Sequence, residues 1–307
     1  SNKIFKIYFK VIKMNLKGLG VAMITPFKND GSIDFQAIPG IIENFITGRV
    51  DYIVLFGTTA EVTCLTDNEK KALIQAVVEA NQNKIPLVIG IGGNDTVKVL
   101  NEIQTSDLHP FQAILSVSPY YNKPSQEGIY QHFGQLAKAS SLPIIVYNVP
   151  SRTGSNIYPE TFLRMTKDFE NIIAIKDASG DMIQAQEILR ICPPHIQVIS
   201  GDDALTLPML LAGAVGTISV LANALPIPLL RMFHYVENGE FEKAYNLHYS
   251  LLEIVNLIFE EGNPVGVKAL MASMDFCGKT VRLPLIGASS DLHDRIENSL
   301  KTSVYST

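Results

Sequence analysis

The amino-acid sequence predicts an α/β fold: a (β/α)8, or TIM, barrel with a C-terminal helical extension. First, short apolar runs alternate eight times with helical patterns along the chain. Second, the 307 residues exceed the roughly 250 of a single barrel, which leaves room for an extension. Third, no strand pattern follows residue 239, where only helical patterns continue.

The eight expected strands are apolar runs without alternating polar residues, a pattern typical of strands buried on both faces. They lie at 19–25, 52–56, 86–91, 113–117, 144–147, 172–176, 196–200 and 215–220. Helices are expected to start near Asp34, Asp67, Asp95, Ser125, Pro159, Asp181, Asp202 and Pro226. Since parallel strands need crossover helices and eight of them close a barrel, this order indicates a closed parallel sheet.

The chain is expected to have three parts: a leader at 1–13, a catalytic barrel at 14–238 and a helical region at 239–307. The leader carries four lysines and no acid, and its apolar runs are too short for a secretory signal. We expect it to lie outside the fold, with Met14 as the functional start and a membrane-surface segment as the alternative. The tail is expected to form helices at 241–261, 264–276 and 292–301 that pack on the barrel or on a second subunit.

Composition excludes several classes of protein. With 25 basic and 30 acidic residues the net charge is −5, which argues against a nucleic-acid partner. The uncharged run 204–230 is long enough for a membrane span, but its prolines and glycines indicate core elements instead. Three cysteines without a CxxC pair indicate a reducing, cytoplasmic compartment, with neither a disulfide framework nor a zinc site.

No metal or other cofactor is expected. The six histidines include no HxH or HExxH pair. Asp202 and Asp203 could hold a metal, but their positions favour helix N-caps. The glycines at 90–93 lack the third glycine of a dinucleotide fingerprint and the lysine of a P-loop.

Lys176 ends the apolar run 172–175 within the stretch NIIAIKDASG. The carboxyl ends of barrel strands are where such folds place their chemistry. Burial there disfavours the charged ammonium and lowers a lysine pKa, and a neutral amine forms Schiff bases with carbonyl substrates. The alternative is that Lys176 pairs with Asp177 or extends to solvent. Lys268 is a second candidate amine, but no strand precedes it.

Other strand ends carry polar side chains that could serve the same site. Thr58 and Thr59 follow a glycine and could bind a small carboxylate, or form an ordinary turn. Tyr147 could exchange protons with the amine, or simply pack. Arg152, in what we expect to be a rigid loop, could bind a substrate carboxylate through two N–H groups, or stay solvated.

Taken together, five motifs resemble those of the dihydrodipicolinate synthase family, over residues 14–301. They are GTTAE at Gly57, SPYYNKPSQEG at Ser118, YNVPSRTG at Tyr147, IKDASG at Ile175 and SGDDALTL at Ser200. The resemblance implies a class I aldolase-type lyase of lysine and diaminopimelate biosynthesis. Pyruvate would condense with Lys176 to an enamine, which would attack the aldehyde of L-aspartate 4-semialdehyde.

The resemblance also implies roles for individual residues. Catalysis would involve the Schiff-base lysine Lys176, the general acid/base Tyr147 and a proton relay through Thr58 and Tyr121. Substrates would be bound by Thr59 (pyruvate carboxylate), Arg152 (semialdehyde carboxylate) and the backbones of Gly201 and Ile218. Tyr121 would reach in from a neighbouring subunit, which makes a dimer the minimal catalytic unit and a tetramer of tight dimers the expected assembly.

The chain departs from the family pattern at two places. Ala60 and Val62 stand where glycine and serine are common, so the turn after Glu61 is expected to differ in shape. At the site where lysine-inhibited members carry histidine and glutamate, this chain has Asp67, Lys70 and Lys98, although Asn94 and Tyr120 remain. The charge of Lys98 would repel a lysine ligand, so feedback inhibition is expected to be weak.

Two other functions remain open. A sister enzyme such as N-acetylneuraminate lyase would share Lys176 and Tyr147, but such lyases generally lack the arginine at 152. A non-catalytic barrel that binds 2-keto acids is the second alternative, and the set Thr58, Tyr121 and Tyr147 argues against it because binding alone needs no proton relay.

Overall fold

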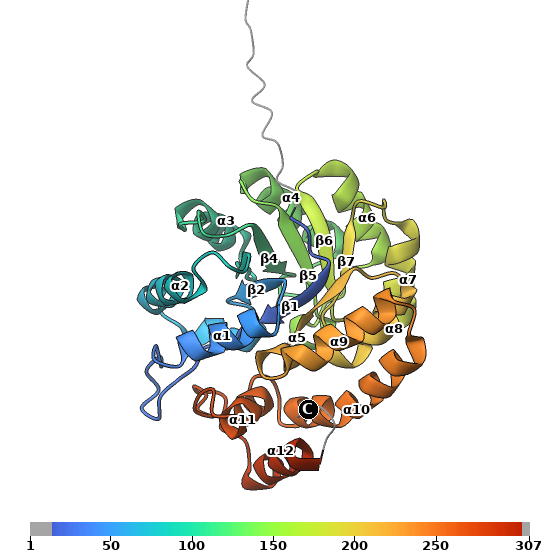
Figure 1. Cartoon of the computed structure of the whole chain (residues 1–307). Coiled ribbons are helices and arrows are strands. Elements are labelled where there is room, and N and C mark those ends of the chain that lie inside the picture. Colours follow the sequence, from blue (N-terminus) through green and yellow to red (C-terminus); the bar gives the residue numbers. More distant parts are fainter. Residues whose placement is uncertain (1–13, 303–307) are drawn as a thin grey trace, which may run out of the picture.

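The computed structural model describes residues 14–302, so the predicted leader at 1–13 lies outside the described residues. Eight parallel strands close into a barrel in sequence order, and Figure 1 shows helices surrounding the strands. They are β1 (Gly18–Ala22), β2 (Tyr52–Leu55), β3 (Leu87–Gly90), β4 (Ala113–Val117), β5 (Ile144–Asn148), β6 (Ile172–Asp177), β7 (Gln197–Ser200) and β8 (Gly216–Ser219). The predicted barrel and all eight strands are confirmed.

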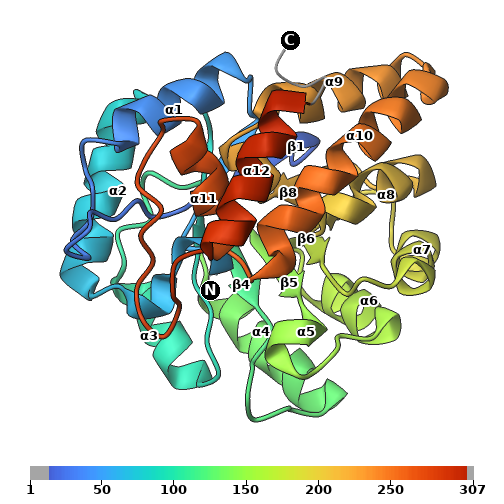
Figure 2. The ribbon, with the colours of Figure 1, turned by 90° about the horizontal axis from the view of Figure 1, so that it is seen from below.

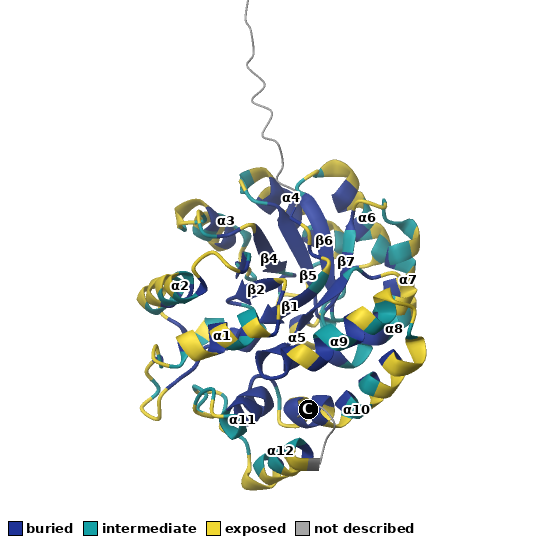
Figure 3. Cartoon of the chain, in the orientation of Figure 1, coloured by how far each residue is buried: buried dark blue, intermediate teal, exposed yellow. Residues whose placement is uncertain are grey.

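A helix follows each strand and covers the outside of the barrel. These helices are α1 (Ile38–Thr47), α2 (Asp67–Asn81), α3 (Thr96–Thr105), α4 (Gln126–Ala139), α6 (Pro159–Asp168), α7 (Met182–Ile191), α8 (Thr206–Ala212) and α9 (Pro226–Glu237). In Figure 3 their buried faces point to the strands and their exposed faces to solvent. Asp95, Ser125 and Asp181, near which helices were expected to start, accept backbone N–H bonds as the N-caps of α3, α4 and α7.

Two predicted helix starts are wrong. The first helix begins at Ile38 instead of Asp34, because residues 27–33 turn back through a bridge between Phe27 and Ile33. The helix that follows β7 was expected to start near Asp202. The chain there first forms a 3-10 turn, η3 (Asp203–Leu205), and the α-helix starts at Thr206. Three further short turns follow strands: η1 (Thr58–Ala60) and η2 (Val62–Cys64) after β2, and η4 (Leu221–Asn223) after β8.

The core has two parts, as expected for a barrel wrapped by helices. The larger cluster lies between the strands and the surrounding helices. The smaller one fills the barrel interior and includes Tyr52, Ala174, Ile199 and Ile218, all at most 1% exposed. A packed interior leaves room for a ligand only beyond the strand ends, so the barrel directs the search to its rims.

The C-terminal region consists of α10 (Phe241–Glu260), α11 (Val265–Ser273) and α12 (Ser290–Thr302). It lies below the barrel in Figure 1 and in front of it in Figure 2, which is seen from below. The predicted tail helices are thus confirmed to within a few residues, whereas the domain boundary at 238 stays a prediction. No helix in the described range 14–302 has the length and apolar character that crossing a membrane requires.

Candidate active site

Lys176 lies one residue before the end of β6 and is 5% exposed. Its Nζ is 4.3 Å from the centroid of the Tyr147 ring on the neighbouring strand β5. Asp177 faces the other way: its carboxylate accepts hydrogen bonds from Asn148 Nδ2 at 3.1 Å and Ser179 Oγ at 2.8 Å. Burial raises the pKa of the Asp177 carboxyl. The alternative in which Lys176 is held by Asp177 is therefore wrong, and the lysine faces Tyr147.

A cavity of about 600 Å³, here called the lysine cavity, opens beside Lys176. Six of the eight predicted site residues line it: Lys176, Tyr147, Thr58, Thr59, Arg152 and Gly201. They come from the segments that follow β2, β5, β6 and β7, or from the ends of those strands. The cavity thus combines an amine, a phenol, two hydroxyls and a guanidinium at one rim, a set suited to covalent chemistry on a small acidic carbonyl compound.

Thr58 and Thr59 lie in η1, which begins directly after Gly57. Thr59 is 2% exposed, and its Oγ1 accepts a hydrogen bond from Asn263 Nδ2 at 2.9 Å. Both threonines line the lysine cavity, and a hydroxyl group can donate one hydrogen bond to a ligand while it accepts others.

Arg152 lies in a helical turn and not in the expected loop. The turn is α5 (Pro150–Thr153), which starts with proline and ends at Gly154 with φ 72°. Arg152 is exposed and lines the outer part of the lysine cavity. Its guanidinium therefore lies beside the cavity, where it could pair with a charged group of a ligand.

Gly201 brings backbone close to the lysine. Its N–H donates to the Asp177 carbonyl at 2.7 Å, which continues the pairing of β6 and β7 beyond the strands. A Cβ at this position would lie 2.9 Å from Lys176 Cε and 2.8 Å from the Ala178 Cβ. Glycine is required here because the lysine chain passes over its backbone.

Two predicted site residues do not line the lysine cavity within the described chain. Ile218 is 1% exposed and packs in the barrel interior. Tyr121 has φ 71° and is 87% exposed, with its N–H bonded to the Thr153 carbonyl at 3.3 Å. Its side chain is exposed to solvent and does not line the lysine cavity of the described chain.

A second cavity of about 330 Å³ adjoins the first and shares Thr58, Tyr147, Val149 and Arg152 with it. Its far end is formed by Lys70, Glu102 and Tyr120. The Lys70 Nζ pairs with Glu102 Oε1 at 3.3 Å, which joins α2 to α3. Lys98 is not among the residues that line this cavity; its side chain is 86% exposed.

One wall of the lysine cavity was not predicted from the sequence. Asn256, Phe259, Glu260 and Asn263 line it from the end of α10 and the residues just beyond. Their spacing of three and four residues marks one helical face, but any amphipathic helix shows it. The local signal in the sequence is the turn-forming stretch Asn263-Pro-Val-Gly-Val-Lys268, and nothing within that stretch links Asn263 to the cavity.

The acids of the β7 loop have different roles. Asp202 accepts the Ala204 N–H, as the predicted N-cap does. Asp203 is not a cap: its Oδ2 accepts the N–H groups of Val220 at 2.9 Å and Leu221 at 3.0 Å, and so ties the β7 loop to the β8 loop. Burial raises the pKa of Asp203. Across residues 14–302, no three His, Cys, Asp or Glu side chains form a group that could hold a metal ion.

Comparison with known proteins gives one consistent result. A sequence model described as "Dihydrodipicolinate synthetase family" matches residues 15–303. The 4-hydroxy-tetrahydrodipicolinate synthase of Flavobacterium psychrophilum is 50% identical over 280 residues, which cover 91% of this chain and 96% of that protein. The enzyme of the same name from Parabacteroides distasonis is 45% identical over 288 residues, 94% of this chain and 97% of that protein.

Solved structures agree. The dihydrodipicolinate synthase of Thermotoga maritima superposes with a TM-score of 0.90 at 35% identity and covers 93% of this chain and 97% of that chain. The enzyme of Cyanidioschyzon merolae, solved with lysine bound, gives a TM-score of 0.88 at 32% identity over 93% of this chain and 97% of that one. The match of the family model over residues 15–303, together with a relative that is 50% identical over 91% of the chain and a solved structure of the same fold, shows that the chain belongs to the dihydrodipicolinate synthetase family.

Proposed function

We propose that the chain acts as a 4-hydroxy-tetrahydrodipicolinate synthase, a lyase that condenses pyruvate with L-aspartate 4-semialdehyde in lysine and diaminopimelate biosynthesis. The names of its relatives support this reaction. The observation that carries it is the buried amine of Lys176, which lies 4.3 Å from the Tyr147 ring in a cavity large enough for both substrates.

Lys176 is the nucleophile of this mechanism. Its neutral amine adds to the C2 carbonyl carbon of pyruvate, and loss of water from the carbinolamine leaves a protonated Schiff base. Loss of a proton from C3 gives the enamine, whose C3 attacks the aldehyde carbon of the semialdehyde and forms the new carbon–carbon bond. The semialdehyde amine then displaces Lys176 as the product cyclises and leaves.

Tyr147 carries the protons of these steps, because its phenol is the acid–base group next to Lys176. Thr58 and Tyr121 connect it to solvent. Tyr121 belongs to the neighbouring subunit in this scheme, which its exposure of 87% in one protomer supports. The proposed assembly is a tetramer built from tight dimers.

The remaining residues bind substrate carboxylates. Thr59 receives the carboxylate of pyruvate, and the exposed Arg152 receives that of the semialdehyde as it enters. The backbone of Gly201 lines the cavity beside Lys176, whereas Ile218 packs in the barrel interior below it. No metal or nucleotide takes part. The three free thiols support a cytoplasmic location.

Borohydride trapping tests the mechanism. With pyruvate present, one adduct per chain is expected to map to Lys176, and Lys176→Ala should abolish both trapping and turnover. Lys268→Arg serves as the matched lysine control, and an adduct at position 268 would overturn the mechanism. Turnover of N-acetylneuraminate above that of pyruvate with semialdehyde would favour the sister lyase, and pyruvate binding without trapping or turnover would favour a sensor.

A further inference from the structure

The turn that carries Thr58 and Thr59 is held from the C-terminal region. Glu61 closes this turn in the left-handed conformation, with φ 52°, and is 5% exposed. Its Oε1 accepts a hydrogen bond from Lys268 Nζ at 2.6 Å, and its Oε2 accepts one from the backbone N–H of Arg282 at 2.8 Å. Left-handed backbone is unfavourable for glutamate, so these bonds to the carboxylate stabilise a strained turn.

Lys268 is dedicated to this contact. It is fully buried, donates a second bond to the Thr280 carbonyl at 2.9 Å and lies 4.1 Å from the centroid of the Phe27 ring. Replacing a buried ion pair by apolar groups is often tolerated, but removing one partner leaves the other charge uncompensated. The pair therefore couples α11 to the turn after β2.

Asn263 reaches the same turn from within the lysine cavity. Its Nδ2 donates to Thr59 Oγ1 at 2.9 Å, and both residues line the cavity. A hydroxyl that accepts this bond keeps its own proton for another acceptor. Asn263 Oδ1 has no hydrogen-bond partner among the described residues. The amide oxygen therefore does not accept the Thr59 hydroxyl proton, which stays available to a ligand.

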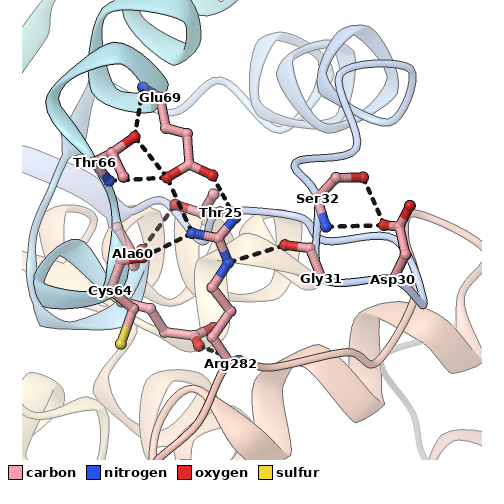
Figure 4. A network of polar contacts seen from close by, with 10 residues as sticks. Thr25, Asp30, Gly31, Ser32, Ala60, Cys64, Thr66, Glu69 and Arg282 are labelled. Atoms are coloured by element: carbon pink, nitrogen blue, oxygen red, sulfur yellow. Dashed lines mark hydrogen bonds and ion pairs between the residues drawn. The ribbon is translucent and has the colours of Figure 1, made fainter.

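Arg282 completes the attachment, as Figure 4 shows. Its guanidinium donates to the Gly31 carbonyl, the Cys64 carbonyl and the Glu69 carboxylate. On the opposite side Thr25 Oγ1 donates to the Ala60 carbonyl at 2.8 Å. The segment from Thr59 to Cys64 is thus fixed by Thr25, three residues beyond β1, and by side chains of the C-terminal region.

We propose that Asn263 and the Glu61–Lys268 ion pair are positioning residues that hold the Thr59 hydroxyl as a donor to the pyruvate carboxylate. Asn263 sets the direction of the hydroxyl proton. The ion pair keeps the turn, and with it the oxygen, in place. The C-terminal helical region is then part of the substrate site and not only a cover for the barrel. This inference rests on the proposed function, because it takes the pyruvate-binding role of Thr59 from it.

Asn263→Asp tests the direction of the proton with little change in shape. A carboxylate accepts where the amide donates, so the Thr59 hydroxyl would turn to it and away from the substrate. The KM for pyruvate is expected to rise about 10-fold or more, with kcat changed far less, because one hydrogen bond to a charged group is lost. The control is Asn246→Asp, the same change at an exposed position of α10. An unchanged KM for pyruvate in folded Asn263→Asp would overturn the proposal.

The ion pair is tested by separating stability from positioning. Lys268→Met alone is expected to lower Tm, because Glu61 stays buried without its partner. The double variant Glu61→Gln, Lys268→Met removes that charge, so Tm should recover while the KM for pyruvate stays raised several-fold. Lys268→Arg should restore both, and Lys243→Met breaks an exposed pair of α10 as the control. Recovery of KM together with Tm in the double variant would show a purely structural pair.

The outcome for the proposed function is read separately. Borohydride trapping at saturating pyruvate depends on Lys176 and not on these positioning residues. Wild-type protein that traps pyruvate while Asn263→Asp keeps a normal KM would refute only the positioning role. Wild-type protein that fails to trap pyruvate would refute the proposed function itself.

Discussion

Lys176 faces the cavity because of where it lies in β6. Side chains two residues apart in a strand share a face, and Ala174 packs in the barrel interior. Lys176 therefore continues the inner face at the point where the packed interior ends, and Asp177 takes the outer face. The position of Lys176 at the strand end directs its side chain into the cavity, and the pairing of β5 with β6 places Tyr147 beside it.

Gly201→Ala is expected to reduce kcat by about 10- to 100-fold, because a Cβ placed 2.9 Å from Lys176 Cε forces the reacting amine aside. Steady-state kinetics with both substrates would measure this. Gly40→Ala on α1 is the control: a Cβ there meets nothing within 4 Å, so kcat should stay unchanged. A normal kcat for Gly201→Ala would show that the lysine is not confined by this backbone.

Arg152→Ala is expected to weaken use of the semialdehyde through loss of a charge-assisted contact worth about 1.5–3 kcal/mol, or roughly 10- to 150-fold in kcat/KM. Pyruvate trapping should be unaffected. Arg152→Lys keeps the positive charge but loses the planar guanidinium, so its kcat/KM for the semialdehyde should lie between those of the wild-type protein and Arg152→Ala. Equal losses for both substrates would contradict the assignment.

At the scale of elements, the turn after β2 depends on partners that the chain supplies far away. The start of α2 is one example: Glu69 caps the helix with Thr66 and also pairs with Arg282. The guanidinium, together with the Thr66 N–H, lowers the pKa of Glu69 to about 2 from its usual 4.5. A carboxyl with a lowered folded pKa stabilises the protein above its unfolded pKa and loses that effect as the pH falls.

Arg282→Met is therefore expected to lower the free energy of unfolding most above about pH 4.5, with the loss shrinking as the pH falls toward 2. Denaturant titrations of both proteins across this range would measure the difference. A part independent of pH should remain, because Arg282 also donates to two carbonyls. A difference that stays constant with pH would exclude a role for the Glu69 charge.

The elements α2 and α3 bear on regulation. Lysine is expected to inhibit weakly: the resemblance assigns Lys98, which is on α3, to a position where lysine-inhibited family members carry a carboxylate, and its cation would repel a lysine ligand. Lys98→Glu should increase sensitivity in an inhibition assay. The control Lys71→Glu makes the same charge change on α2 and should leave the sensitivity to lysine unchanged. Inhibition of the unmodified enzyme by submillimolar lysine would contradict this expectation.

At the scale of the whole molecule, the described chain does not bring Tyr121 to the lysine cavity, although the proposed relay includes it. Lys176, Tyr147 and Thr58 line one cavity, whereas Tyr121 extends from the surface. A side chain that large and exposed, fixed on a backbone with φ 71°, is suited to enter a neighbouring copy of the chain.

Mixing Tyr121→Phe with Lys176→Ala should restore activity that neither variant has. Each mixed dimer would hold one intact site, and random exchange makes half of the dimers mixed, so about a quarter of the wild-type activity is expected. Tyr147→Phe mixed with Lys176→Ala is the control: both residues line the same cavity, so every site stays broken. Failure of the first mixture to exceed the second would place Tyr121 outside the partner's site.

The local features of this protein were determined by its sequence. Strands follow from unbroken apolar runs, and helix starts follow from side chains such as Ser125 and Asp181 that bond to the next N–H groups. The order of eight such units predicts the closed barrel, and a barrel brings all strand ends to one rim. Lys176, Tyr147 and the threonines could therefore be assigned to one site before their distances were known.

Only the tertiary structure decided how that site is closed and held. Asn263 contacts Thr59 across 204 residues of chain, and Lys268 contacts Glu61 across 207. Such contacts depend on how the C-terminal helices pack below the barrel, and no spacing within either segment encodes them. A lysine within a helical sequence pattern is normally expected at the surface, yet Lys268 is fully buried. Burial depends on how distant segments pack together, whereas a sequence pattern describes one segment alone.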